Sequence, residues 1–92
     1  MNVTVEYSAQ LGAAIGVAEE SVETGPSCTL AGLIGLLAER HGDAFRVMVL
    51  DDTGRTLPWI VLTVGDRTVD FDSPPTLEDG QTLSIITPIS GG

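Results

Sequence analysis

The sequence contains no lysine, one cysteine and one histidine. Its four basic residues are all arginines: Arg40, Arg46, Arg55 and Arg67. The single cysteine, Cys28, excludes an internal disulfide framework and an iron–sulfur cluster held by four thiolates. It suits a reducing compartment, so we expect a cytoplasmic protein.

The sequence also lacks a long apolar run and a basic segment followed by an apolar one. We therefore expect neither a membrane span nor a secretion signal. Thirteen acidic residues against four basic ones give a net charge of −9, which argues against nucleic acid and against an anionic membrane surface as partners. The charge favours a partner with a basic surface, although acidity can also simply keep a small protein in solution.

The first part of the chain predicts strands around a short connection. Residues 2–7 alternate in polarity, which predicts a half-buried strand whose Val3, Val5 and Tyr7 face inward. Residues 8–16 are small and predict a connection, and residues 17–24 predict a second extended segment, with Val22 as its inward residue.

Residues 29–41 predict the one convincing helix. Its apolar side chains recur with helical spacing and form one face: Leu30, Leu33, Ile34 and Leu37. Thr29 can cap its start and Gly42 marks its end.

The second part of the chain predicts mainly strands. Residues 46–50 and 55–57 predict a hairpin around an Asp-Asp-Thr-Gly turn. Residues 59–64 predict the strongest strand, with Ile60, Leu62 and Val64 on one face and Trp59, Val61 and Thr63 on the other. A short strand over 67–70 and a final strand from Leu83 follow. One helix among several strands predicts an α+β fold, with the helix packed across a sheet.

Few residues could form a self-contained active site. His41 suits the C-terminal end of its helix through the helix dipole, and Cys28, near the start of that helix, could be a reactive thiol or a half-buried loop residue. We expect neither a catalytic nor a metal site among these side chains, and we expect the Asp51-Asp52 pair to serve the turn.

The last ten residues, 83–92, predict a strand that leads into a segment almost without side chains. Pro88 ends the hydrogen-bond ladder, and Gly91 and Gly92 leave the terminal carboxylate unobstructed. Together with the Leu-Glu-Asp-Gly turn at 77–80, this end resembles the ubiquitin-like sulfur carriers, which include the small subunit of molybdopterin synthase and the thiamine-pathway sulfur carrier.

The resemblance implies a ubiquitin-like β-grasp fold, a mixed sheet with one main helix packed across it, over a single domain of residues 1–92. Residues 88–92, the tail, would be its functional segment. It also implies that the protein is not an enzyme but a carrier. An adenylating enzyme of the ubiquitin-activating type would activate the Gly92 carboxylate with ATP, and a thiocarboxylate would then donate sulfur to a synthase. The protein itself would bind no cofactor.

Two roles fit this resemblance: a subunit of molybdopterin synthase, or a sulfur donor for cysteine, thiamine or a secondary metabolite. We favour the second because the hairpin predicted over residues 47–57 is typical of the longer carriers. A ubiquitin-like modifier joined to target lysines is an alternative, although without lysine the chain cannot form lysine-linked polymers of itself. A plain interaction module with an incidental Gly-Gly is another.

The strand pattern also predicts a docking surface. Trp59, Val61 and Ile86 fall on the sheet face away from the helix, near the root of the tail. We expect them, with Pro88 and Ile89, to contact the activating enzyme and the acceptor, unless the preceding loop or the hairpin covers them.

Overall fold

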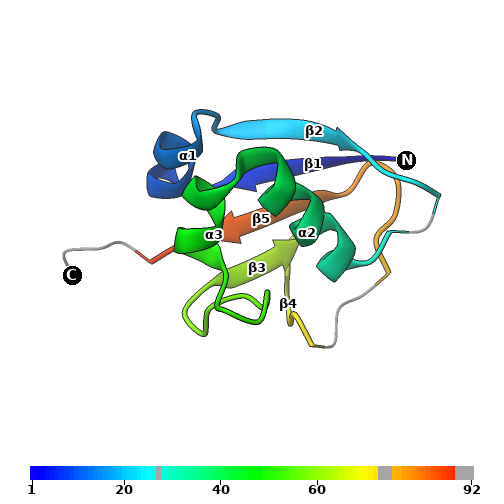
Figure 1. Cartoon of the computed structure of the whole chain (residues 1–92). Coiled ribbons are helices and arrows are strands. Elements are labelled where there is room, and N and C mark those ends of the chain that lie inside the picture. The colour runs from blue at the N-terminus through cyan, green and yellow to red at the C-terminus, as the bar shows by residue number, and fades with distance from the viewer. Residues whose placement is uncertain (27, 73–75, 89–92) are drawn as a thin grey trace.

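Five strands form one mixed sheet in the computed structural model, which describes residues 1–26, 28–72 and 76–88 (Figure 1). Their order across the sheet is β2-β1-β5-β3-β4. The strands are β1 (Asn2–Tyr7), β2 (Glu19–Glu23), β3 (Val61–Val64), β4 (Arg67–Val69) and β5 (Thr82–Ile86). The first and last strands of the sequence are therefore neighbours, paired in parallel, and all other pairs are antiparallel.

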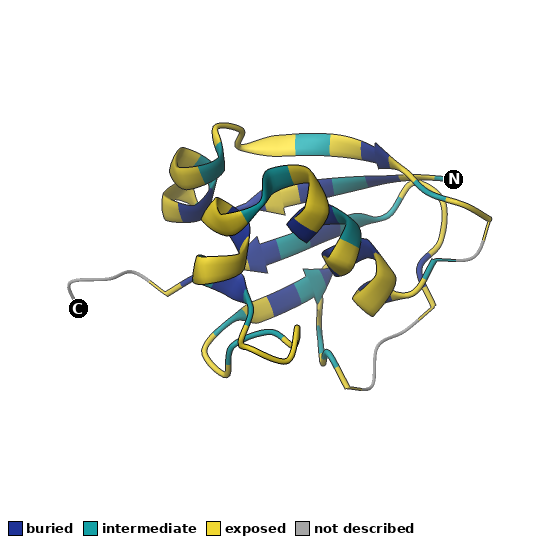
Figure 2. Ribbon diagram, in the orientation of Figure 1, coloured by how far each residue is buried: buried dark blue, intermediate teal, exposed yellow. Residues whose placement is uncertain are grey.

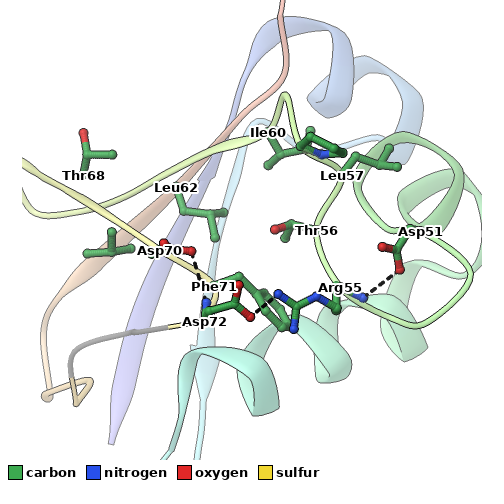
Figure 3. Close-up of a pocket in the computed structure, with 12 residues that line it drawn as sticks. Asp51, Arg55, Thr56, Leu57, Ile60, Leu62, Thr68, Asp70, Phe71 and Asp72 are labelled. Carbon is green, nitrogen blue, oxygen red and sulfur yellow. Dashed lines mark hydrogen bonds and ion pairs between the residues drawn. The ribbon is translucent and has the colours of Figure 1, made fainter.

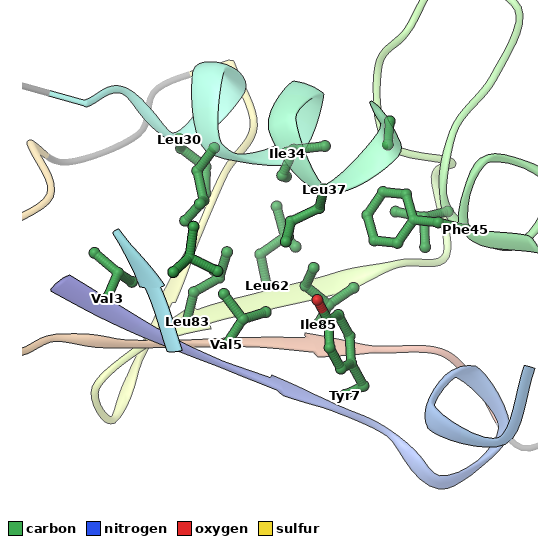
Figure 4. Close-up of a cluster of buried hydrophobic side chains, with 14 of the residues drawn as sticks. Val3, Val5, Tyr7, Leu30, Ile34, Leu37, Phe45, Leu62, Leu83 and Ile85 are labelled. Atoms are coloured by element: carbon green, nitrogen blue, oxygen red, sulfur yellow. The ribbon is translucent and has the colours of Figure 1, made fainter. Parts of the chain in front are cut away.

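Alternation of side chains gives the sheet one buried face. Val3, Val5 and Tyr7 of β1 point inward as predicted, and Leu83 and Ile85 of β5 do the same (Figure 4). Parallel register pairs Val5 with Leu83 and Tyr7 with Ile85, so the inward residues of the two strands lie side by side. The polar residues between them face the other side of the sheet.

Helix α2 (Leu30–His41) covers that inner face, as the sequence predicted (Figures 1 and 2). Its buried residues are Leu30, Leu33, Ile34, Leu37 and Ala38. The Thr29 hydroxyl accepts a hydrogen bond from the Gly32 amide at 3.0 Å and caps the helix. Gly42 ends it at a φ of 67°, a backbone conformation that favours glycine.

Residues 8–16 were predicted as a connection, and this was wrong, because they contain helix α1 (Ala9–Ile15). The segment is rich in alanine, the best helix former, and buries Leu11. Only two of its residues, Leu11 and the half-buried Ile15, pack into the core, and two residues are too few to reveal a helical period in the sequence. Helix α1 packs against helix α3 (Asp43–Val49), which the sequence analysis also did not predict.

The hairpin predicted over residues 46–57 was also wrong. Residues Asp43–Val49 form helix α3, which buries Phe45 and Val49 one turn apart. The glycine-containing turn between two apolar segments suggested a hairpin, but the two buried side chains are spaced for a helix. The turn at residues 51–54 and an isolated bridge between Leu50 and Thr56 are what remains of the hairpin. The sheet therefore carries three helices among the described residues, of which α2 is the longest.

The strand predicted from Trp59 begins two residues later, at Val61. The Ile60 amide donates to the Leu57 carbonyl at 3.0 Å, so Pro58 and Trp59 lie in a turn. Within β3 the faces are as predicted, with Leu62 and Val64 buried and Val61 exposed. The turn frees Trp59 from the sheet ladder and leaves it exposed.

A polar cluster at Glu20 links β1, β2 and α2. The Glu20 carboxylate lies 2.5 Å from the Tyr7 hydroxyl, 2.7 Å from Arg40 Nη1 and 2.5 Å from His41 Nε2. Burial opposes ionisation of Glu20, but hydrogen bonds from Tyr7, Arg40 and His41 outweigh it, so the pKa of this carboxyl lies below its usual value. Burial and the bond to Glu20 raise the pKa of the Tyr7 phenol, which stays neutral.

No helix in the described part of the chain is both long and apolar enough to cross a membrane.

A pair of substitutions in α3 tests the helix against the predicted hairpin. Val47 and Val49 would share a face in a strand, but in α3 Val49 is fully buried and Val47 is 76% exposed. We expect Val49→Ala to lower the free energy of unfolding by about 1.5–3 kcal/mol through lost burial. Val47→Ala should change it by less than about 0.5 kcal/mol. Equal losses in urea denaturation would contradict the helix.

The Glu20 cluster makes stability depend on pH. Because the folded-state pKa of Glu20 is lowered, its contribution is present above the ordinary carboxyl pKa and is lost as pH falls through the folded value. Glu20→Gln should therefore lower the free energy of unfolding at pH 7 and flatten its decline in acid. Urea denaturation between pH 7 and pH 3 measures both, with Glu23→Gln on the same strand as control. An acid limb as steep as that of the unsubstituted protein would contradict this role.

Candidate functional site

The sheet places the end of β5 beside the end of β1 and the start of β3. Ile86 is the last residue of β5, and Thr87 and Pro88 continue from it. Thr87 is 8% exposed and Pro88 is exposed. The predicted site residues Gly91 and Gly92, and the predicted contact residue Ile89, lie outside the described residues. The root of the tail, Thr87 and Pro88, therefore continues from the central strand of the sheet.

The predicted docking residues that lie in the described part of the chain are exposed. Trp59 is 56% exposed, Val61 42% and Ile86 40%. Val61 and Ile86 are direct partners in the antiparallel pairing of β3 with β5, on the sheet face opposite the helices. We call Trp59, Val61 and Ile86 the apolar patch. Ile86 directly precedes Thr87 and Pro88, so the patch adjoins the root of the tail, and Trp59 lies in the turn that leads into β3.

The rest of that sheet face is polar and acidic. Glu6 of β1 faces the same side, and its carboxylate accepts a hydrogen bond from the Ser84 hydroxyl of β5 at 3.2 Å. Across this face of the sheet, Ser84 lies between Glu6 on β1 and Thr63 on β3. The Glu6 carboxylate therefore lies on the same face as Ile86, in a protein whose net charge is −9.

A shallow hollow of about 540 Å³ lies between the 51–60 segment and the β3–β4 edge (Figure 3). Arg55 forms an ion pair with Asp72 and lies over the Phe71 ring at 5.5 Å from its centre. Asp51 accepts hydrogen bonds from Thr53 and from the Arg55 amide, so it serves the turn as predicted.

The titratable groups of this hollow are engaged with one another. Hydrogen bonds from Thr53 lower the pKa of Asp51, and Arg55 lowers it further by a smaller amount. The hydrogen bond to Asp72 raises the pKa of Arg55. Arg55, Asp51 and Asp72 thus each have a partner within this segment, and these contacts hold the local structure together.

The two reactive residue types of the chain serve structural contacts. Cys28 is half-buried, and its thiol lies 3.4 Å from the Thr29 carbonyl oxygen. His41 belongs to the Glu20 cluster, which the sequence analysis missed because Glu20 lies 21 residues away along the chain. Among the described residues no group of three metal-ligating side chains comes together.

The sequence analysis also missed Ser8 and Thr87, whose hydroxyl oxygens lie 2.7 Å apart. Seventy-nine positions separate them in the sequence, and no local motif connects them. Only the parallel pairing of β1 with β5 brings them together.

No protein-family model and no curated protein sequence matches this chain. Solved structures do. SAMP1 from Haloferax volcanii is similar over 100% of both chains, at 20% identity and a TM-score of 0.87. A protein from Pyrococcus furiosus, described as molybdopterin converting factor subunit 1, is 26% identical over 97% of this chain and 99% of its own, with a TM-score of 0.75. The BexX/CysO complex of Amycolatopsis orientalis contains a chain that is 27% identical over 98% and 99%, with a TM-score of 0.72.

These similarities span nearly the whole chain and agree with the mixed sheet, its strand order and its covering helices. This chain has the ubiquitin-like β-grasp fold, and its structural neighbours are the ubiquitin-like sulfur carriers and modifiers that its sequence resembles.

Proposed function

We propose that this protein is a sulfur carrier whose Gly92 carboxylate alternates with a thiocarboxylate. The observation that carries the proposal is the position of β5. The last strand of the sequence lies at the centre of the sheet, anchored on both sides by β1 and β3, and leads directly to the Gly-Gly end. A rigid root and a tail end without side chains suit a segment that enters another protein's active site.

The chemistry needs partners, because a carboxylate is a poor acyl group. An adenylating enzyme of the ubiquitin-activating type would join the Gly92 carboxylate to AMP and release pyrophosphate from ATP. A persulfide sulfur would then attack the acyl carbon and displace AMP. Reduction of the resulting sulfur–sulfur bond by a second thiol of the partner would leave the thiocarboxylate and a disulfide. A reducing cytoplasm suits these steps.

The apolar patch and the surrounding acids support this use of partners. Apolar residues in the middle of a polar face are typical of a contact surface, and the negative charge would favour a basic active-site entrance. The similarity to a chain of the BexX/CysO complex supports a sulfur-accepting synthase as the second partner. The acceptor would belong to a cysteine, thiamine, molybdopterin or secondary-metabolite pathway. In the molybdopterin case, this chain would be the small subunit of molybdopterin synthase.

A second candidate is a protein modifier, which the similarity to SAMP1, a small archaeal modifier protein, favours. Activation would be the same, but an amine of the target would displace AMP and form an amide. Conjugates of higher mass in cell extract would distinguish this function from sulfur transfer.

Intact mass spectrometry of the protein from its native host tests the carrier function. We expect a fraction that is heavier by the difference between one sulfur and one oxygen atom, and fragmentation should place it at Gly92. The same species should form in vitro with ATP, the adenylating enzyme of the host and a persulfide donor. Deletion of Gly92 should abolish it. A plain carboxylate under all these conditions would contradict the carrier function.

Replacement of Trp59 tests the apolar patch. Trp59→Ala should raise the Kd for the adenylating enzyme at least about thirtyfold, since a central aromatic contact is worth about 2 kcal/mol or more. Val47, an apolar residue on α3, is even more exposed than Trp59, and Val47→Ala should leave that Kd unchanged. Isothermal titration calorimetry measures both, and equal affinities for the two variants would contradict the patch as a docking surface.

A further inference from the structure

Ser8 joins the end of β1 to the segment that follows β5. Its amide donates to the Ile85 carbonyl oxygen at 3.1 Å. Its hydroxyl oxygen accepts a hydrogen bond from the Thr87 amide at 3.0 Å and lies 2.7 Å from the Thr87 hydroxyl. Three contacts therefore hold two segments that are 79 residues apart in the sequence.

The Ser8 hydroxyl takes a place in the sheet ladder that a backbone carbonyl would normally hold. In the register of β1 and β5, the next rung would join the Thr87 amide to the carbonyl of Ser8. That carbonyl is already used, because it accepts from the Gly12 amide at 2.8 Å and begins α1. The hydroxyl therefore extends the ladder by one rung while the backbone of β1 turns away into the helix.

The usual function of a serine at this position is left unused. Ser8 is the N-cap of α1, where a serine side chain normally accepts a hydrogen bond from the first turn of the helix. No such bond forms in α1. The hydroxyl contacts Thr87 instead. Helix α1 therefore lacks the stabilisation of a side-chain cap, and the root of the tail gains a contact.

Thr87 is the last point at which the sheet can hold the chain through a backbone donor before the tail. Pro88, the next residue, has no amide hydrogen. Thr87 is also the one buried polar residue among the described parts of the chain. The amide and the hydroxyl of Thr87 both contact Ser8. These contacts hold the chain at the point where it passes from β5 into the tail.

We propose that Ser8 and Thr87 form a clamp that fixes the direction in which the chain leaves the sheet at Pro88, and that both are positioning residues for activation of the terminal carboxylate. The second half of the proposal rests on the proposed function. Without the clamp the segment could swing about Ile86, and a smaller fraction of molecules would present the tail to the partner. Apparent affinity falls in proportion to that fraction.

Two variants weaken the clamp, one at each residue, and two retain it. Ser8→Ala removes the acceptor of the Thr87 amide, and Thr87→Val removes the hydroxyl with little change of shape. Thr87→Ser and Ser8→Thr keep the hydroxyls and should behave as the unsubstituted protein does. Ser84→Ala is the matched control, because it removes another hydroxyl contact between β5 and β1, the one to Glu6, upstream of the tail root.

The first measurement needs no partner. Relaxation of ¹⁵N amides in the full chain gives order parameters for Thr87, Ile89 and Ser90. We expect lower values in Ser8→Ala and Thr87→Val than in the unsubstituted protein, with unchanged spectra for the strand interiors. Unchanged order parameters in both variants would overturn the clamp, and so would an equal decrease in Ser84→Ala.

The second measurement is pyrophosphate exchange with the purified adenylating enzyme of the host. The KM for the carrier should rise about five- to tenfold in the two clamp variants, as expected for the loss of one or two hydrogen bonds, while kcat stays the same. An unchanged KM would overturn the positioning role. If the unsubstituted protein is not adenylated at all, the proposed function fails, while the order parameters still decide the clamp.

Discussion

Parallel pairing of β1 with β5 is the constraint on which the rest of the structure depends. It joins the two ends of the described chain, with Thr4 opposite Thr82 and Tyr7 opposite Ile85. A slip of one residue would turn Leu83 and Ile85 outward and empty the centre of the core. The same pairing places the root of the tail at the middle of the sheet, where it has a neighbour on each side.

Three features gather around the end of this strand pair, on different sides of it. The Glu20 cluster holds Tyr7 at the end of β1 on the helix side. Ser8, the next residue, holds Thr87 in the plane of the sheet. The apolar patch, with Ile86 at its edge, lies on the opposite face. The root of the tail is thus supported from inside the molecule and presented beside a surface that a partner can cover.

The fold is shared with proteins of only 20–27% identity because few positions in it demand a particular residue. The sheet requires alternation, and α2 requires an apolar face, a cap and a stop. Many residues meet these requirements, so similarity of structure persists where similarity of sequence is low. The contact of Ser8 with Thr87 is of a different kind, because it depends on two particular hydroxyl groups and not on a pattern of apolar and polar residues.

The sequence by itself determined β1, α2, β5 and the faces of β3, because each depends on a local period or a local cap. It also determined the exposure of Val61 and Ile86 through alternation along their strands. It did not determine α1 or α3, which are too short to show a helical period and are stabilised mainly by burial of Leu11, Phe45 and Val49. Only the tertiary structure decided the Glu20 cluster and the contact of Ser8 with Thr87. Their partners are distant in the sequence, and hydrogen bonds between distant residues leave no periodic pattern along the chain.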